Sequence, residues 1–332
     1  MTSSHLSVLC TGGAGFIGSH LTRRCVDLGW TVDVVDDMSG SSCVVPGPGV
    51  RNFIIDDLAC SRVLDAVRAG VYDVVFHMAA LARVSYSVEH PITTHVANVE
   101  RTLRLIEACS PANVRRFVFS SSSSVYGDTH QLPTPEDHTR RPRSPYALQK
   151  AVIEDYLRLY GELYGLESVC LRYFNVFGPG QTGSSPYSTA IAAWLTAIDQ
   201  QRPLRSDGDG EQSRDMCYVD NVVDANVAAA LHTGLLCGMP INIACGQTHT
   251  NNEILERIVR RYPDARVLTA PVRSGDVRVT HADITRMREV LGIMPGVDLW
   301  EGLERTIAWH ESLPGWRNRS DTPGVWCGTK PA

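Results

Sequence analysis

The sequence predicts an α/β protein built on a doubly wound parallel sheet, because short β-rich runs alternate with longer helical patterns through its first half. Two further observations support this class. The 332 residues suffice for one large domain or two moderate ones with a sizeable core. The chain is 43% hydrophobic and 20% charged, which is ordinary for a globular protein and excludes intrinsic disorder.

The first half is expected to alternate strands and helices. Short runs rich in β-branched and aromatic residues predict the strands, at residues 6–11, 31–36, 50–55, 73–77 and 116–120. Apolar residues at helical spacing predict the helices between them, at residues 15–28, 62–69 and 96–109. This order favours a parallel sheet with helices on both of its faces.

The longest amphipathic segment covers residues 144–164, where apolar residues recur at intervals of three and four. A strand is expected at 168–173. Beyond Asn175 the regularity weakens, and segments rich in Gly, Pro, Ser and Asp predict loops at 178–186 and 203–210. Short helices are expected near residues 190–200, 219–231 and 252–260.

Charge and cysteine spacing limit the partners and the compartment. The formal net charge of −5 offers no basic field for nucleic acid. No apolar run approaches the roughly 20 residues of a membrane span, and the short polar start of the chain does not resemble a signal peptide. The ten cysteines have neither C-x-x-C nor zinc spacing, so we expect reduced thiols, no metal site and a cytoplasmic protein.

A glycine-rich segment follows the first expected strand. Gly12, Gly15 and Gly18 have the spacing G-x-x-G-x-x-G and stand where a helix opens. Such glycines permit a tight turn and bring backbone amides close to a pyrophosphate at the positive end of the helix. This arrangement predicts a Rossmann-type dinucleotide site.

Acidic residues after the next two strands indicate which dinucleotide binds. Asp36 ends the second strand, 18 residues after Gly18. A carboxylate there can accept hydrogen bonds from both ribose hydroxyls of NAD and repels the 2′-phosphate of NADP. Asp57 and Leu58, after the third strand, suit a contact with adenine. The predicted cofactor is therefore NAD.

Tyr146 and Lys150 lie four residues apart on the longest expected helix, so their side chains share one face. The Lys150 ammonium should stabilise a phenolate and lower the pKa of Tyr146 toward neutrality. A tyrosine tuned in this way can exchange a proton with a carbinol. The serine run 120–124 ends a buried strand and offers a hydroxyl group that can orient the substrate oxygen.

These motifs form an ordered set, and the chain resembles the extended short-chain dehydrogenase/reductase family, the NAD-dependent nucleotide-sugar epimerases and dehydratases. The resemblance runs from Leu6 to about His310. It rests on the segments 11–18, 77–80, 120–127, 146–150, 172–178, 208–218 and 273–276.

The resemblance implies a Rossmann-type sheet with a smaller, discontinuous α/β substrate-binding lobe. We expect an NAD-binding domain at 1–174, to which segments around 215–245 return. Residues 175–312 should form mainly the second lobe, and 313–332 a C-terminal tail. A homodimer joined through a four-helix bundle of the 96–109 and 144–164 helices is also implied.

Family roles carry over to matching positions. Ser122 becomes the catalytic serine, Tyr146 the base and Lys150 its partner. The implied cofactor contacts are Gly12, Gly15, Phe16, Ile17, Asp36, Asp37, Gly40, Ser41, Asp57, Leu58, Met78, Ala79, Ala80, Asn98, Tyr146, Lys150 and Tyr173.

On the substrate side, the resemblance implies that Asn175, Arg214 and Arg273 bind the diphosphate of a UDP-sugar and that Asp276 binds the uridine ribose. Two guanidinium groups suit such an anion. The implied substrate contacts are Arg83, Ser122, Ser123, Ser124, Tyr146, Asn175, Ala190, Ile191, Arg214, Arg273, Asp276 and Thr280.

The same resemblance separates possible reactions. Family members begin by oxidising the sugar at C4, where Tyr146 removes the hydroxyl proton. Dehydratases and decarboxylases carry acidic residues directly after the catalytic serine, where this chain has Ser123 and Ser124. We therefore expect NAD-dependent 4-epimerisation through a transient 4-keto sugar. A dehydratase or decarboxylase that uses another carboxylate, and a non-catalytic NAD sensor, remain alternatives.

The identity of the sugar is less constrained. Thr280 stands where the family has a gate residue near the sugar C2 substituent, and its small size predicts room for the N-acetyl group of UDP-GlcNAc or UDP-GalNAc. UDP-Glc and UDP-Gal are also expected as candidate substrates. Arg83 departs from the usual family residue and favours a uronate, which leaves UDP-glucuronic acid as an alternative. Asp207 replaces a more usual Tyr or Asn, so the uracil contact stays open.

Overall fold

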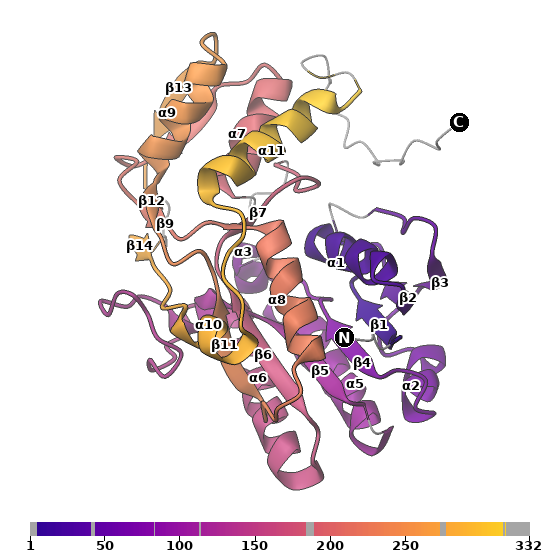
Figure 1. Cartoon of the computed structure of the whole chain (residues 1–332). Coiled ribbons are helices and arrows are strands. Elements are labelled where there is room, and N and C mark those ends of the chain that lie inside the picture. The colour runs from indigo at the N-terminus through magenta and orange to yellow at the C-terminus, as the bar shows by residue number, and fades with distance from the viewer. Residues whose placement is uncertain are drawn as a thin grey trace.

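The computed structural model describes residues 5–40, 44–82, 84–112, 114–183, 189–272, 277–314 and Trp316. Its centre is a seven-stranded sheet in which every neighbouring pair is parallel (Figure 1). From one edge to the other the strands are β3 (Val50–Ile55), β2 (Thr31–Asp36), β1 (Ser7–Thr11), β4 (Val74–His77), β5 (Arg116–Ser122), β6 (Ser168–Tyr173) and β11 (Met239–Ile243). The predicted parallel α/β fold is confirmed.

The strand order reverses between β1 and β4. From β1 the chain proceeds to β2 and β3 on one side, and then crosses to β4, β5 and β6 on the other. In open α/β sheets, ligands bind beyond the carboxyl ends of the strands at such a switch point. This edge of the sheet is where the glycine-rich segment and the serine run emerge.

Helices cover both faces of the sheet because successive strand residues point to opposite sides. Val8 and Cys10 join one buried cluster, and Leu9 joins the other. The first cluster includes side chains of α1 (Phe16–Asp27), α8 (Val219–Leu231) and α10 (Thr285–Leu291). The second includes side chains of α2 (Ser61–Arg68), α5 (Arg101–Cys109) and α6 (Pro145–Tyr164).

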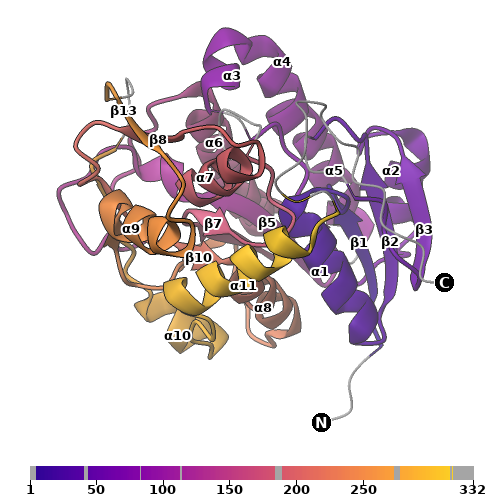
Figure 2. The same cartoon turned by 90° about the horizontal axis from the view of Figure 1, so that it is seen from above.

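A third buried cluster organises a smaller lobe beside the sheet. In Figure 2 its three main helices lie together, away from the β2–β3 edge. These helices are α7 (Ala190–Asp199), α9 (Asn251–Arg261) and α11 (Leu299–Ser312). Short strand pairs accompany them: β8 (Leu204–Asp207) with β13 (Val267–Ala270), β9 (Ser213–Arg214) with β12 (His249–Thr250) and β14 (Val279–Thr280), and β7 (Val176–Phe177) with β10 (Cys217–Tyr218).

The structure corrects several sequence predictions. The expected helix at 96–109 begins with a π-helical turn, η1 (Val96–Glu100), before α5, and α4 (Pro91–His95) precedes it. The expected loop at 203–210 contains β8, which pairs with β13, about sixty residues away in sequence. Loop-forming residues on both sides of β8 obscured this short strand.

The sequence prediction also omitted several further elements of the described chain, α11 among them. β11 extends the sheet beyond β6, and α3 (Val84–Glu89) packs against α6. α10 covers β11. No helix in the described ranges is long and apolar enough to cross a lipid bilayer.

Candidate active site

Ser122, Tyr146 and Lys150 come together at the carboxyl end of the sheet. Ser122 ends β5, while Tyr146 and Lys150 lie in the first two turns of α6. The Ser122 side chain lies close enough to the Tyr146 phenol to influence its pKa. The Lys150 ammonium lies 5.8 Å from the centroid of the Tyr146 ring and 4.7 Å from that of Phe119.

Local sequence fixes the start of α6 and with it the direction of Tyr146. Ser144 is the N-cap, and its Oγ accepts a hydrogen bond from the amide of Ala147 over 3.2 Å. Pro145 occupies the first helical position, where its missing N–H costs nothing. The Tyr146 amide donates to Ser87 Oγ on α3 over 3.1 Å, so a neighbouring helix supports the same turn.

Burial governs the electrostatics of the pair. Desolvation lowers the pKa of Lys150 to about 7, against a smaller opposing effect of Glu154. Desolvation also raises the pKa of Tyr146 to about 12, although the nearby Ser122 side chain acts to lower it. The predicted fall of the Tyr146 pKa toward neutrality is therefore not found in the chain alone, because burial outweighs stabilisation of the phenolate.

The serine run divides between the two faces of β5. Ser122 Oγ accepts hydrogen bonds from the Ser124 amide over 3.2 Å and from the Ser124 hydroxyl over 3.0 Å, and it caps the short helix η3 (Ser123–Tyr126). Ser121 points away from this site and donates to Glu154 over 2.6 Å. The cap therefore holds Ser122 while Ser121 anchors the same strand end from behind.

The glycine-rich segment forms a cradle in which side chains have no room. Gly12 has φ +67°, and a Cβ there would lie 2.6 Å from the Ala79 nitrogen. A Cβ at Gly18 would lie 2.0 Å from the Gly12 oxygen. α1 begins at Phe16 and its N-cap Gly15 provides no side-chain cap, so the positive helix end is left to backbone amides. This cradle fits the pyrophosphate of a dinucleotide.

Asp36 is held rigidly at the end of β2. Its two carboxylate oxygens accept hydrogen bonds from the amides of Ala14 over 3.0 Å and Met38 over 2.9 Å. Burial raises the pKa of Asp36 despite these bonds. Asp57 forms an ion pair with Arg101 of α5, whose Nε lies 2.7 Å from its carboxylate. Both acids face the region that a ribose and an adenine require.

The segment after β4 closes the cradle. The amide of Met78 donates to Thr11 O over 3.1 Å, and that of Ala79 to Thr11 Oγ1 over 3.3 Å. Asn98 accepts from the Leu81 amide and donates to Gln149 Oε1, each over 2.8 Å. The Asn98 side chain thus ties this segment to α6. The predicted cofactor contacts Met78, Ala79 and Asn98 are brought to one wall.

Two further predicted cofactor positions flank this wall. The Tyr173 hydroxyl accepts a hydrogen bond from Asn226 Nδ2 over 2.8 Å and donates its proton to Met78 Sδ over 3.7 Å. Gly40 lies in the irregular segment after β2, as Asp37 does. Ser41 lies outside the described residues.

The structure links Asn175 directly to Thr280, although 105 residues separate them. Asn175 Nδ2 donates to Thr280 Oγ1 over 2.9 Å and to Asp215 O over 3.0 Å. Thr280 pairs with Arg214 across the β9–β14 ladder. Three predicted substrate residues therefore form one connected wall.

Asp215 stabilises this wall, and the sequence analysis did not single it out. Its buried carboxylate accepts hydrogen bonds from the amides of Cys245 over 2.9 Å, Gly246 over 3.1 Å and Ala282 over 3.1 Å. Burial raises the pKa of Asp215 to about 6 despite these donors. These hydrogen bonds of Asp215 join the loops after β11 and β14.

Other predicted substrate positions are less informative. Ala190 and Ile191 begin α7, and Ile191 is buried. Asp207 accepts a hydrogen bond from Arg205 Nε over 2.6 Å. Arg83, Arg273 and Asp276 lie outside the described residues. Among the described residues, no group of His, Cys, Asp and Glu side chains could hold a metal ion.

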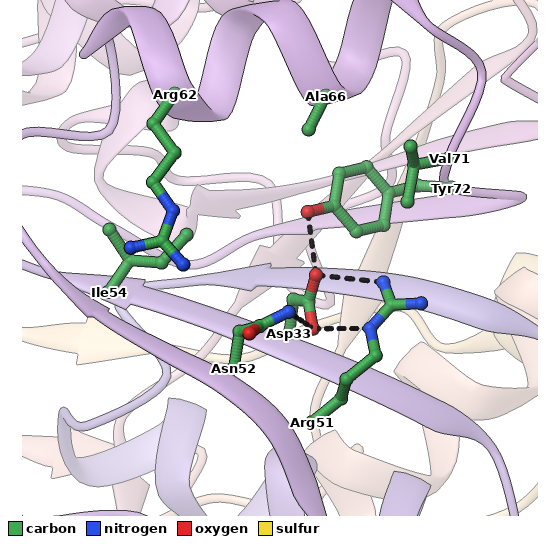
Figure 3. A pocket seen from close by; sticks show the side chains of 8 residues that line it. All are labelled: Asp33, Arg51, Asn52, Ile54, Arg62, Ala66, Val71 and Tyr72. Atoms are coloured by element: carbon green, nitrogen blue, oxygen red, sulfur yellow. Dashed lines mark hydrogen bonds and ion pairs between the residues drawn. The ribbon is translucent and has the colours of Figure 1, made fainter.

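A separate hollow of about 310 Å³ lies at the β2–β3 edge, beneath α2 (Figure 3). Asp33 is buried on its floor and accepts hydrogen bonds from Arg51 over 2.9 and 2.8 Å, from Asn52 over 3.0 Å and from Tyr72 over 2.8 Å. Burial opposes ionisation of Asp33, but these donors prevail and lower its pKa. We interpret the cluster as structural: it binds the edge strand β3 to β2, and the hydrogen bonds within it already satisfy the Asp33 carboxylate.

Comparisons agree with this geometry. The model of the NAD dependent epimerase/dehydratase family matches residues 8–244. The chain therefore belongs to this family.

Individual relatives match over nearly their whole length. A UDP-glucose 4-epimerase of Mycolicibacterium smegmatis is 36% identical over 312 residues, which are 91% of this chain and 97% of the relative. The solved UDP-N-acetylglucosamine 4-epimerase from Methanobrevibacter ruminantium M1, in complex with UDP-N-acetylmuramic acid, is 36% identical with a TM-score of 0.86, and covers 93% of this chain and 99% of its own. The solved NAD-dependent NDP-hexosamine 5,6-dehydratase TunA is 29% identical with a TM-score of 0.84, and covers 94% and 99%.

Proposed function

We propose that this chain interconverts UDP-sugars that differ in configuration at C4, with NAD as a bound cofactor. The observation that carries the proposal is the meeting of Ser122, Tyr146 and Lys150 beside the glycine cradle, with serines at 123 and 124. The UDP-sugar 4-epimerases among the relatives support it.

Bound NAD supplies a reversible two-electron acceptor for the sugar carbon. The chain supplies the proton chemistry and the orientation. Tyr146 takes the proton from the 4-hydroxyl group and later returns one, with Ser122 as hydrogen-bond partner of the same oxygen. Lys150 favours the phenolate form of Tyr146 by its charge. Return of the electrons to the opposite face of C4 inverts the centre without net oxidation.

The cofactor and substrate roles of individual residues are part of this proposal. Gly12, Gly15, Phe16 and Ile17 bind the pyrophosphate, and Asp36 selects NAD over NADP. On the other side, Asn175, Arg214 and the predicted Arg273 bind the UDP diphosphate, and the predicted Asp276 binds the uridine ribose. The second lobe, residues 175–312, closes over the sugar.

For the sugar, we favour UDP-GlcNAc and UDP-GalNAc. Thr280 is a small side chain on the wall formed with Asn175, which leaves space for an N-acetyl group. UDP-glucose, UDP-galactose and UDP-glucuronic acid are alternatives for the same chemistry. Elimination or decarboxylation is disfavoured, because the carboxylate of Glu154, behind Ser121, is already bound by Arg172 over 2.6 Å.

We also propose a homodimer in the cytoplasm. α6 exposes the apolar side chains of Leu148, Leu159, Leu163 and Tyr164, and the first three share one helix face, which suits packing against the same helix of a second copy. The eight cysteines of the described chain are free thiols, which is typical of a reducing compartment.

The activity test uses the purified chain and UDP-GlcNAc without added NAD. We expect UDP-GalNAc to accumulate to an equilibrium mixture, resolved by chromatography and mass spectrometry. A product that has lost water or CO₂ contradicts the proposal.

A further inference from the structure

A buried charged cluster lies directly behind the catalytic side chains. Tyr146, Lys150 and Glu154 follow one another at intervals of four on α6, so they share one helix face. Glu154 is 5% exposed and Arg172, on β6, is 3% exposed. A carboxylate this deeply buried requires hydrogen-bond or ion-pair partners. For Glu154, one turn beyond Lys150, these partners come from outside α6.

The partners of Glu154 connect three elements. Arg172 holds both oxygens, from Nε to Oε1 over 2.8 Å and from Nη2 to Oε2 over 2.6 Å. Ser121 donates its hydroxyl to Oε1 over 2.6 Å, and Arg140 donates to Oε2 over 3.3 Å. Ser121 and Arg172 are direct neighbours across the β5–β6 ladder. Glu154 therefore fixes the ends of both strands against α6.

These strand ends carry the reactive groups. Ser121 lies between Ser120 and Ser122. The Ser120 carbonyl oxygen accepts a hydrogen bond from the Lys150 ammonium over 2.6 Å. A displacement of Ser121 would move both neighbours relative to Tyr146. Positioning errors of about 1 Å can cost roughly 100-fold in rate.

Glu154 also acts on Lys150 by charge. Burial lowers the pKa of Lys150 to about 7, and the Glu154 carboxylate raises it, followed by Cys170 on β6. His77 on β4 faces Lys150 as well, but burial keeps it neutral by lowering its pKa to about 3. Tyr146, on the same helix, also lies near Lys150, and the charge of Arg172 is paired with that of Glu154. Glu154 is thus the anionic group that acts most on the ammonium.

We propose that Glu154 is a positioning residue for the active site: it anchors Ser121 and Arg172 so that Ser122 meets Tyr146, and its charge favours the ammonium form of Lys150. This inference rests on the proposed function for its catalytic consequence, but its effect on Lys150 can be measured without turnover.

The composition of the chain makes that measurement direct. Lys150 and Lys330 are its two lysines. Protein labelled with ¹³C-lysine gives two side-chain Cε signals, which Lys330→Arg assigns, and their shifts against pH give each titration midpoint. In Glu154→Gln, we expect the Lys150 midpoint to fall by about one pH unit while that of Lys330 stays unchanged. An unchanged Lys150 midpoint in Glu154→Gln would overturn the claim that the charge of Glu154 favours the ammonium form of Lys150.

Activity then separates positioning from folding. Ser121→Ala keeps the buried ion pair but removes one donor to Glu154, so we expect kcat to fall about tenfold with the KM for the UDP-sugar unchanged. In Glu154→Gln, the alkaline limb of the kcat profile should move to lower pH together with the Lys150 midpoint. Glu162→Gln is the matched control, since Glu162 lies on the exposed side of α6 and pairs with Arg158.

Two provisions keep the outcomes distinct. Should Glu154→Gln fail to fold because Arg172 is left buried without a partner, the double variant Glu154→Gln/Arg172→Met removes both charges. A smaller fall of the Lys150 midpoint is then expected, because loss of the Arg172 cation offsets part of the loss of the Glu154 anion. A wild-type midpoint in the double variant contradicts the inference. If the wild-type chain converts no UDP-sugar, the proposed function fails, and the lysine titration still tests Glu154.

Discussion

Lys150 Nζ donates a hydrogen bond to the backbone carbonyl oxygen of Ser120 over 2.6 Å. This bond joins α6 to the end of β5 and aims the lysine at the site before any ligand is present. The ammonium is almost fully buried there, at 4% exposure. Burial of a cation costs stability, so this geometry serves function at the expense of the fold.

Lys150→Met should therefore stabilise the chain without ligand at low pH. The pKa of Lys150 falls from 10.5 to about 7 on folding, because burial disfavours its charge. The cost is fully present below pH 7 and disappears as pH rises from 7 toward 10.5, where the folded state binds fewer protons than the unfolded state. We expect a gain in unfolding free energy of about 2–4 kcal/mol at pH 6 that shrinks by pH 9, measured by urea denaturation. An equal gain at both pH values contradicts the burial of a charged lysine.

Tyr146→Phe should abolish epimerisation and leave cofactor binding intact. The phenol is the proposed proton acceptor, and loss of a positioned acid–base group costs about 10²–10⁴ in kcat. Calorimetric titration with NAD and the thermal midpoint should match the wild type. Activity within a factor of about three of the wild type would exclude Tyr146 as the base.

Asp36→Asn should weaken NAD binding and reduce discrimination against NADP. The amide keeps one oxygen for backbone donors but loses the charge that receives the ribose hydroxyls. Loss of a charge-assisted hydrogen bond predicts an increase in the Kd for NAD of about tenfold or more. Asp65→Asn, on the exposed face of α2, is the control. An unchanged ratio of NADP to NAD affinity argues against Asp36 as the residue that binds the ribose hydroxyls of NAD.

Thr280 offers two separable tests. Thr280→Val preserves shape but removes the oxygen that accepts from Asn175, so we expect the KM for the UDP-sugar to rise about fivefold with little change in kcat. Thr280→Ser retains the oxygen and should behave like the wild type. Thr280→Tyr should selectively remove activity on UDP-GlcNAc and spare UDP-glucose. Equal losses of activity on both sugars would refute the role of Thr280 as the residue that limits the sugar C2 substituent.

The exposed face of α6 tests the dimer. Leu159→Glu with Leu163→Glu should convert the protein to a monomer in sedimentation velocity experiments, because charge replaces apolar contact at the centre of the proposed interface. Leu268→Glu, at an exposed position on β13 of the second lobe, is the control and should leave the assembly unchanged. A monomeric wild type contradicts the four-helix bundle.

The features that sequence predicted well depend on local spacing. Six of the seven strands of the sheet, all except β11, and the helix that carries Tyr146 and Lys150 follow from periodicity within one segment. The glycine cradle follows likewise, because its three glycines occupy a single turn between β1 and α1.

The features that sequence missed depend on pairing over long distances. The bond between Asn175 and Thr280 requires the small β9–β14 ladder. The Glu154 cluster requires the register that places Ser121 beside Arg172. A buried glutamate in a helix of mixed composition carries no local signal of its partners. The short strand β8 escaped for the same reason, since β13 completes it from about sixty residues away.

The most direct measurement follows the purified chain with UDP-GlcNAc, UDP-glucose and UDP-glucuronic acid in parallel, without added NAD, with product identity determined by mass spectrometry and NMR. We predict a product of unchanged mass with inverted configuration at C4, for UDP-GlcNAc above all, and none from Tyr146→Phe. Conversion of no UDP-sugar, or accumulation of a 4-keto, dehydrated or decarboxylated product, would contradict a 4-epimerase.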